Sequence, residues 1–588
     1  MTYTAPVETM AFALSAIADL ESDAREGWAA DASADVVDGI LAEAGRFAAG
    51  RLAPLNRDGD RLGATLADGV VTQPPGWREA YQDWAQGGWN GIDLPADWGG
   101  MGLPTRLAAA GMEMWTSACM SFALGPVLTQ GAVDTLVLHA TPELQARYLP
   151  KLVSGEWTAT MNLTEPQAGS DLGALRTRAV PAGDGTYRLF GQKIFITYGE
   201  HSLADNIVHL VLARLPDAPP GSRGISLFLV PKFIPNSDGS PGTRNDVVCA
   251  GLEHKLGIHA SPTCMMAFGN AEGAVGWLVG EENRGLACMF TMMNKARLYT
   301  GLQGVAIAER ATQQALGYAR ERRQGRAPGS GDATVPIIAH PDVRRNLATM
   351  RALTSAARAV AYAAASAIDR AHAHPDPAER ARASDLAGLL TPITKAWCTD
   401  IGVEVTSIGV QVHGGMGYVE ETGAAQHFRD ARIPPIYEGT NGIQAIDLVT
   451  RKVLKPGSTV ARDTVAGWQA LAREAGGAGA LAPTAALVAE ACAALCEATG
   501  WIETHANNTA ALLASATPYL RLWGTTAGAA GLLKGARAAE ALRKAGDDRP
   551  VLSQAIDDAR FFAANMAVLA PSLRRIVCTG YVPDQSAF

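Results

Sequence analysis

The feature that most constrains the fold is a change of periodicity between Trp157 and Trp277. Short β-rich runs fill this stretch, separated by turns such as Gly183-Asp184-Gly185 and by a Pro/Gly cluster at 218–224. Such runs, bounded by turn residues, are typical of β-strands joined by hairpins. We therefore expect an all-β middle domain, with strands at 187–190, 194–197, 207–212, 225–230 and 263–268.

Helical periodicity dominates on both sides of this stretch. Ala/Leu-rich segments broken by Gly and Pro run from residue 10 to about 154. After Gly285 a long helix is expected to end in the basic cluster 320–326, with further helices at 342–370 and 378–410. A linker-like stretch at 455–458 precedes Ala-rich helices that continue to residue 588.

The sequence thus predicts an α+β chain, since 588 residues are too many for one hydrophobic core and suit about three or four domains. The expected domains are a helical N-terminal domain, a middle β domain, a helical bundle and an additional C-terminal helical domain, with the boundaries 1–156, 157–278, 279–455 and 456–588.

Composition excludes several classes of protein. A hydrophobic content of 48% with 18% charged residues is that of a soluble globular protein. The net charge of −8 gives no electrostatic reason to expect nucleic acid or an anionic membrane as partner. The longest uncharged stretch, 115–133, contains Ser, Thr, Gln, Gly and Pro, so we expect a buried helix, a turn and a second helix there, not a membrane span.

The cysteines and the N-terminus bear on the compartment. The eight cysteines contain no CxxC pair, so we expect reduced thiols and no metal site. The first ten residues have no basic segment followed by an apolar core, and no secretory signal is expected. Both observations favour a cytoplasmic protein.

The strongest candidate for a catalytic group is Glu438, in the loop 433–444. Two prolines stiffen the entry of this loop and two glycines permit tight backbone geometry. The carboxylate stands beside Tyr437 and is flanked by apolar residues that could desolvate it, which is how a base with a raised pKa is presented.

No common nucleotide cradle is present, because the chain lacks a Walker A motif and a strand-borne GxGxxG. Two other stretches could hold a cofactor. The loop 161–171 supplies hydroxyls and backbone N–H groups suited to polar edges and phosphates. The strand 191–197 carries aromatic and hydroxyl side chains that could lie against a planar ring.

Taken together, these stretches resemble the acyl-CoA dehydrogenase family over nearly the whole chain to about residue 455. The resemblance rests on motifs that occur in the family's order: Thr164-Glu165-Pro166, Gly169-Ser170-Asp171, 193–197, Glu321-Arg322-Arg323-Gln324, 411–418, 429–432 and Tyr437-Glu438-Gly439-Thr440. The run 252–259 and the additional C-terminal helices are most similar to the 3-methylmercaptopropionyl-CoA dehydrogenase subgroup.

The resemblance implies FAD as cofactor and an acyl-CoA as substrate. Two sets of residues are implied to bind FAD. The first set surrounds the flavin ring: Leu163, Thr164, Gly169, Ser170, Phe195 and Thr197. The second set holds the pyrophosphate and adenosine of a neighbouring subunit's FAD: Arg322, Gln411, Gly414 and Gly415. Thr440 is implied to contact the same cofactor. The implied substrate-binding residues are Ser170, Arg297, Tyr437 and Gly439. An obligate homo-oligomer, a dimer or a tetramer, follows from sites shared between subunits.

The implied reaction is α,β-dehydrogenation of the thioester to the trans-2-enoyl-CoA. Glu438 takes the α proton, its N–H and a ribityl hydroxyl bind the enolate oxygen, and flavin N5 accepts the β hydride. An electron-transfer flavoprotein is the implied electron acceptor, and the implied pathways are fatty acid metabolism and dimethylsulfoniopropionate catabolism.

The sequence departs from the family pattern at two places that would line the binding sites. Arg322-Arg323-Gln324-Gly325 lacks an aromatic residue found in the family, and Met161 stands where an aromatic residue is common.

Three alternatives remain open at this point. An acyl-CoA oxidase of the same fold would pass its electrons to dioxygen, and the sequence does not separate it from a dehydrogenase. A DNA-associated alkylation-response flavoprotein would need a basic tail, whereas the charges of 459–588 are roughly balanced. A non-catalytic scaffold would be expected to have an apolar or amide residue at position 438.

Overall fold

The computed structural model describes residues 3–29, 31–329, 331, 334–477 and 479–583. The chain divides into two compact units, which are described separately below. The sheet unit consists of Phe47–Leu103 and Ala118–Ala296, and the helical unit of Met1–Arg46, Pro104–Ser117 and Arg297–Phe588.

The sheet unit is built on one eight-stranded sheet in the order β10-β11-β5-β12-β7-β6-β3, with β4 paired to β5. Its strands are β3 (Trp157–Asn162), β4 (Arg178–Pro181), β5 (Tyr187–Thr197), β6 (Asn206–Ala213), β7 (Ser226–Pro231), β10 (Val247–Leu252), β11 (Thr263–Phe268) and β12 (Ala274–Val279). Two small hairpins accompany it, formed by β1 (Thr65–Ala67) with β2 (Val70–Thr72) and by β8 (Phe233–Pro235) with β9 (Pro241–Arg244). For the middle domain the family resemblance implies a β-barrel; in the structure the end strands of the sheet, β10 and β3, are not paired with each other.

The interior of the sheet follows from its apolar strands. Every residue of β6 and β7 is buried, as expected of strands covered on both faces. Strand β3 runs parallel to β6, and all other pairings are antiparallel. Three antiparallel pairs join strands that are consecutive in the chain, as the expected hairpin connections require: β4 with β5, β6 with β7 and β10 with β11. The other pairs, β5 with β11, β5 with β12, β7 with β12 and β3 with β6, join strands that are not consecutive.

Four helices complete the sheet unit: α4 (Ala53–Leu62), α5 (Trp77–Gln86), α7 (Met120–His139) and α8 (Pro142–Ser154). Among the described residues, three helical stretches are long and apolar enough to cross a membrane by length and composition alone: α7, Ala482–Thr504 and Pro550–Thr579. In α7, 83% of the apolar window is buried within the protein, so core packing accounts for its composition. The predicted helix, turn and helix at 115–133 is confirmed, because one helix ends at Ala118 and α7 begins at Met120.

The helical unit contains most of the remaining helices. They are α1 (Val7–Ala16), α2 (Leu20–Arg25), α3 (Ala34–Phe47), α6 (Thr105–Ala118), α10 (Pro341–Ala373), α11 (Pro377–His413), α12 (Ala424–Asp430), α13 (Asn441–Asp447), α14 (Val460–Ala475), α15 (Ala482–Thr504), α16 (Thr509–Lys544), α17 (Pro550–Asn565) and α18 (Ala570–Thr579). Helix α9 (Gly285–Glu321) enters this unit at Arg297.

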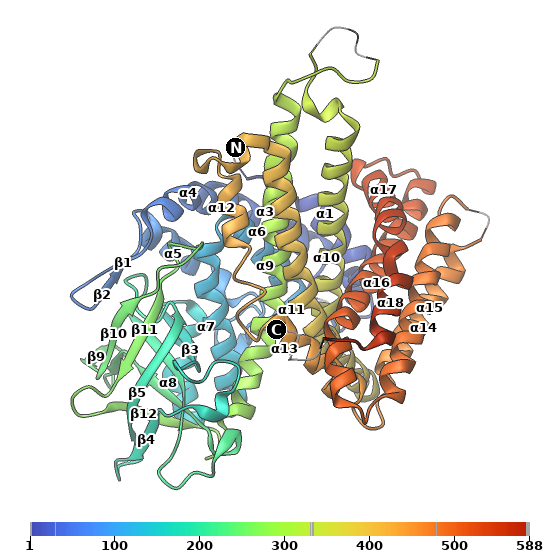
Figure 1. Cartoon of the computed structure of the whole chain (residues 1–588). Coiled ribbons are helices and arrows are strands. Elements are labelled where there is room, and N and C mark those ends of the chain that lie inside the picture. Colours follow the sequence, from blue (N-terminus) through green and yellow to red (C-terminus); the bar gives the residue numbers. More distant parts are fainter. Residues whose placement is uncertain (1–2, 30, 330, 332–333, 478, 584–588) are drawn as a thin grey trace. The chain divides into compact units, whose positions relative to one another are not determined.

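Long helices packed side by side form the centre of the helical unit (Figure 1). A buried ion-pair cluster joins three of them: Arg358 of α10 donates to Glu113 of α6 at 2.6 Å and to Glu309 of α9 at 2.8 Å. The C-terminal helix α16 packs against both α10 and α11, so residues 456–588 are part of this unit and not a separate appendage.

The α+β class, the middle β region and the flanking helices are confirmed. The expected strands 187–190 and 194–197 are one continuous strand, β5, and the sheet strands β3, β4, β10 and β12 were not predicted. The four domain boundaries remain predictions, since the structure divides the chain differently, into two units.

Candidate active site

The loop that carries Glu438 has an unusual backbone. Glu438 has φ +58° and Gly439 has φ +81°, so two consecutive residues lie in the left-handed region. A non-glycine residue there is uncommon and costs of order 1 kcal/mol or more, and such residues cluster at functional sites. The Gln444 side chain donates to the Glu438 carbonyl at 3.1 Å, and the Asn441 N–H donates to the Pro435 carbonyl at 3.0 Å. These bonds hold the strained turn.

The Glu438 carboxylate is poorly solvated. Although the residue is partly exposed, its Oε2 atom is buried and has no hydrogen-bond partner among the described residues. Burial raises the pKa of Glu438, while the positive charges of Arg297 and Lys395 oppose that rise. A carboxylate whose pKa is raised by burial is a stronger base than an exposed carboxylate, which suits a general base.

Two further groups of this site, Arg297 and Gln303, come from α9. Arg297 is buried, and a methyl group on Gly439 would lie 4.0 Å from its Nη2 atom. The Tyr437 hydroxyl donates to the side chain of Gln303. The structure therefore brings together Glu438 with three of the residues expected at the substrate, namely Arg297, Tyr437 and Gly439.

Glycines allow α9 to reach this position against α11. A methyl group on Gly304 of α9 would lie 2.1 Å from the Cys398 carbonyl of α11, so only a glycine fits there. Gly301, one turn earlier, is restricted in the same way, because a methyl group there would lie 2.6 Å from Cγ2 of Thr394. The close approach of the two backbones sets the spacing between the side chains of Arg297 and of α11.

Thr440 is the N-cap of α13, and its Oγ1 accepts from the Ile443 N–H at 3.3 Å. The structure thus shows a capping role for the residue that was predicted to touch FAD. Since Thr440 is exposed, its side chain is also accessible to a ligand.

The predicted second cofactor-binding set lies at helix ends of the helical unit. Arg322 directly follows α9, and Gln411, Gly414 and Gly415 lie at the end of α11; all four are exposed. The rings of Tyr318 and His413 stack at 4.5 Å, which places the ends of α9 and α11 side by side. The His413 ring therefore has a packing role. A methyl group on Gly414 or Gly415 would meet nothing within 4 Å, so the backbone there is open to a ligand.

The predicted flavin-ring residues are held together within the sheet unit. The loop after β3 carries Leu163, Thr164, Gly169 and Ser170, and β5 carries Phe195 and Thr197. The Ile194 N–H donates to the Thr164 carbonyl at 2.9 Å. Lys193 of β5 donates to the Leu163 carbonyl at 3.0 Å and to Glu165 at 2.8 Å. Loop and strand thus form one fixed surface.

A β-bulge shapes this surface. The register between β5 and β11 shifts so that Ile194 and Phe195 oppose Met265 alone, and Phe195 has φ +59°. The Phe195 side chain is consequently 59% exposed, which is unusual for an aromatic residue in a strand. The hydroxyls of Thr164, Ser170 and Thr197 make no side-chain hydrogen bond with any described residue. An open aromatic ring among free hydroxyls fits a planar ring with polar edges, so the residues present suit the flavin of FAD.

Four residues near Glu438 were missed by the sequence analysis: Gln303, Lys395, Asn441 and Gln444. Lys395 offered a signal, since it is a single charge in the apolar helical run Leu389–Cys398. The others are amides that sequence patterns do not distinguish from surface residues. Among the described residues, no cluster of His, Cys, Asp or Glu could hold a metal ion.

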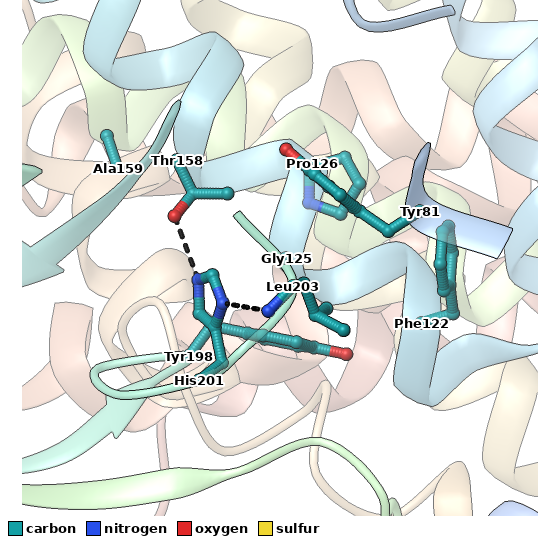
Figure 2. A pocket seen from close by; sticks show the side chains of 9 residues that line it. All are labelled: Tyr81, Phe122, Gly125, Pro126, Thr158, Ala159, Tyr198, His201 and Leu203. Carbon is teal, nitrogen blue, oxygen red and sulfur yellow. Dashed lines mark hydrogen bonds between the residues drawn. The ribbon is translucent and has the colours of Figure 1, made fainter. Parts of the chain in front are cut away.

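A small, mainly apolar cavity lies elsewhere in the sheet unit and contains none of the predicted site residues (Figure 2). It is lined by residues of α5, α7, β3 and the segment after β5: Tyr81, Phe122, Gly125, Pro126, Thr158, Ala159, Tyr198, His201 and Leu203.

Comparison with known families gives four matches in chain order. The acyl-CoA dehydrogenase N-terminal domain matches residues 38–156, the middle domain 160–271 and the C-terminal domain 283–454. A fourth family, described as acetyl-CoA dehydrogenase C-terminal like, matches residues 459–582. The matches cover both units of the structure, including the additional helices.

Individual proteins agree with these matches. The chain is 48% identical over 571 residues to 3-methylmercaptopropionyl-CoA dehydrogenase of Ruegeria pomeroyi, covering 97% of this chain and 96% of that protein. The fold is similar to Caenorhabditis elegans ACDH-11 in complex with C11-CoA, with TM-score 0.76 and 21% identity over 90% of this chain and 88% of that one. It is also similar to an acyl-CoA dehydrogenase complexed with FAD from Bacillus anthracis, with TM-score 0.74 and 22% identity over 95% and 90% of the chains.

Proposed function

The chain belongs to the acyl-CoA dehydrogenase family, and on that premise we propose that Glu438 is the base that removes the α proton of an acyl-CoA substrate. The protein is accordingly an FAD-dependent oxidoreductase acting on acyl-CoA. The observation that supports the role of Glu438 best is its Oε2 atom, which is buried and without a hydrogen-bond partner among the described residues. Burying an unpaired carboxylate oxygen is costly, so a function is the simplest reason to keep it.

The groups around Glu438 fit the demands of this step. The α C–H of a thioester is only weakly acidic, so a base must be combined with stabilisation of the enolate oxygen. The Glu438 N–H donates to no residue that the structure describes and is available for that oxygen. Arg297 and Lys395 favour the ionised form of the carboxylate before it takes the proton. When bound, FAD supplies the acceptor for the hydride that leaves the β carbon.

We propose 3-methylmercaptopropionyl-CoA as the substrate and 3-methylthioacryloyl-CoA as the product, a step of dimethylsulfoniopropionate catabolism. The support is the 48% identity to the Ruegeria pomeroyi enzyme over nearly the whole of both chains. The test is anaerobic bleaching of the flavin by a panel of acyl-CoAs that includes this thioester and butyryl-CoA. A preference for butyryl-CoA would refute the substrate proposal and leave the reaction class standing.

We propose an electron-transfer flavoprotein as the electron acceptor. We also propose that the protein is cytoplasmic and assembles as a homodimer or homotetramer. The exposed positions of Arg322, Gln411, Gly414 and Gly415 suit groups that bind a cofactor from a neighbouring subunit. Oxygen uptake during turnover tests the acceptor, because an oxidase would consume dioxygen in proportion to substrate. Analytical ultracentrifugation tests the assembly, since a stable monomer with full FAD content would contradict shared sites.

The base assignment is tested with Glu438→Gln, which keeps the shape of the side chain and removes its basicity. We expect folded, yellow protein whose flavin is reduced by acyl-CoA at least about 100-fold more slowly, the size expected for loss of a general base. Glu421→Gln is the matched control, because Glu421 is an exposed glutamate of the same unit. Retained reduction in Glu438→Gln would refute the proposal.

A further inference from the structure

Lys395 is a buried charge that the proposed reaction does not yet use. It lies in α11, within an apolar segment, and its side chain has no exposed surface. A lysine is almost never fully buried unless it is paired. Its Nζ donates to the Asn441 side-chain oxygen at 2.9 Å, and Asn441 is the third residue after Glu438. The lysine thus reaches the loop of the base through a single amide.

Asn441 connects that loop to one turn of α11. Its side-chain nitrogen donates to the Ala396 carbonyl at 3.1 Å, to the Thr399 hydroxyl at 3.0 Å and to the Asp400 carboxylate at 2.7 Å. Its backbone N–H donates to the Pro435 carbonyl at the start of the loop. Because Asn441 is bonded on all sides, its position, and with it the path of residues 435–441, is determined by α11.

The charge of Lys395 also acts on Glu438. Burial lowers the pKa of Lys395 to about 7, and the carboxylates of Glu438 and Asp400 oppose that shift. The Lys395 ammonium group likewise opposes the rise that burial causes in the pKa of Glu438. Besides each other, the charged groups that act on these two residues are Arg297 of α9, on both, and Asp400 of α11, on Lys395. Arg297 is influenced in turn by Asp447 of α13 and by Arg451, and Asp400 by Arg432 and by Arg521 of α16.

We propose that Lys395 is a positioning residue for the base: through Asn441 it fixes the loop, and its charge keeps the Glu438 carboxylate ionised in a poorly solvated site. This inference rests on the proposed role of Glu438. Arg297 does not replace Lys395 in this role, because Arg297 belongs to α9, whereas the side chain of Asn441 is bonded to residues of α11.

The test compares Lys395→Met with Lys395→Arg in FAD-loaded protein. Met fills a similar volume in the apolar surroundings and removes the charge, while Arg keeps both the charge and a donor for Asn441. The first readout is the carboxyl C=O stretching band in infrared spectra taken over a pH series without substrate. The contribution of Glu438 is isolated by subtracting the spectra of Glu438→Gln.

We expect Lys395→Met to protonate Glu438 at a pH higher by about one unit or more, since an opposite charge nearby shifts a carboxyl pKa by that amount. The acid limb of the kcat/KM profile should move in the same direction, and kcat/KM at pH 7 should fall at least about tenfold. Lys395→Arg should stay close to the wild type in both readouts. A merely structural lysine would change the melting temperature without moving either titration.

Two further variants keep the inference falsifiable. Lys534→Met removes a lysine of the same unit that bonds instead to Asp19 and the Ile17 carbonyl, and it should leave both titrations in place. Asn441→Leu keeps the lysine but cuts the link to the loop, and it should lower kcat. If Glu438→Gln is inactive while Lys395→Met titrates like the wild type, the positioning role of Lys395 is refuted and the role of Glu438 as base stands. If Glu438→Gln stays active, the role of Glu438 as base is refuted, and with it the role of Lys395.

Discussion

A methyl group placed on the Cα of Gly524 would lie 2.1 Å from Cγ of Trp397. The indole lies across the backbone of α16, and Gly528, one turn later, faces the other end of the same ring at 2.9 Å. Trp397 is 4% exposed and stands two residues after Lys395 on α11. The C-terminal helices therefore pack directly on the turn of α11 that holds the Glu438 loop.

Gly524→Ala should destabilise the helical unit. The added methyl cannot be accommodated without moving Trp397 or separating α16 from α11, and such overpacking typically costs about 1–3 kcal/mol. The measurement is the melting temperature of the FAD-loaded protein, which we expect to fall by several degrees. Activity should fall as well, because displacement of α11 also displaces Asn441 and the loop.

Gly500→Ala on α15 is the control for this substitution. A methyl group there meets nothing within 4 Å, so only the helix propensity changes, by roughly 0.5–1 kcal/mol in favour of Ala. The melting temperature should be unchanged or slightly higher. If Gly524→Ala melts at the temperature of Gly500→Ala, the contact with Trp397 does not support α11.

The sequence predicted elements whose pattern is local. The helices at 342–370 and 378–410 and the strand at 263–268 agree with α10, α11 and β11 because apolar periodicity alone specifies them. Strand β3 was missed, since Trp157–Asn162 mixes Thr, Ala and Asn and finds its partner β6 over forty residues away. Strand β12 was missed because a glycine interrupts its short run.

In the candidate site, too, the sequence predicted what depends on a local pattern and missed what depends on tertiary packing. Glu438 could be predicted, because proline, glycine and a carboxylate stand together in one loop. The neighbours Lys395 and Gln303 could not, since they depend on the packing of α9 against α11 and not on any local pattern. The bulge at Phe195 could not be predicted from the sequence either, because it arises from the register of β5 with β11.

The buried pair Lys193–Glu165 should be required for FAD binding. Glu165 accepts from Lys193 at 2.8 Å and from the N–H groups of Arg176 and Thr177 at 2.7 and 3.0 Å. Burial favours its neutral form, but Lys193 and these hydrogen bonds outweigh burial and lower its pKa to about 2. Lys193→Met leaves the carboxylate buried without its cation, which typically costs about 3–5 kcal/mol. We expect a lower melting temperature and weaker FAD binding in a fluorescence titration.

Glu165→Gln separates charge from shape in the same pair. It keeps an acceptor for one of the two backbone N–H groups but leaves Lys193 without its anion, so it should also destabilise the sheet unit. The folded-state pKa of Glu165 is depressed, so its contribution is present above the ordinary pKa of a glutamate and is lost as pH falls towards 2. The difference in stability between wild type and Glu165→Gln should therefore shrink below about pH 4. A difference that is constant from pH 7 to pH 3 would contradict the assignment.

His201 should make the sheet unit sensitive to acid. Its Nδ1 accepts from the Leu203 N–H at 3.1 Å, so Nε2 carries the hydrogen and donates to the Thr158 hydroxyl at 2.8 Å (Figure 2). Burial lowers its pKa to about 3, assisted by Lys232 and His209. Between pH 6.5, an ordinary histidine value, and pH 3 the unfolded chain binds a proton that the folded protein does not, so stability is lost as pH falls.

His201→Gln should remove this dependence, because an amide can accept from Leu203 and donate to Thr158 without taking up a proton. From pH 6 to pH 4, the free energy of unfolding of the wild type should fall by about 1.4 kcal/mol per pH unit more steeply than that of the variant. Denaturant titrations at each pH measure the slope. The pKa of His209 is also lowered to about 3 by burial, so His209→Gln can be tested in the same way. Equal slopes in the wild type and His201→Gln would mean that the buried imidazole takes up its proton in the folded state.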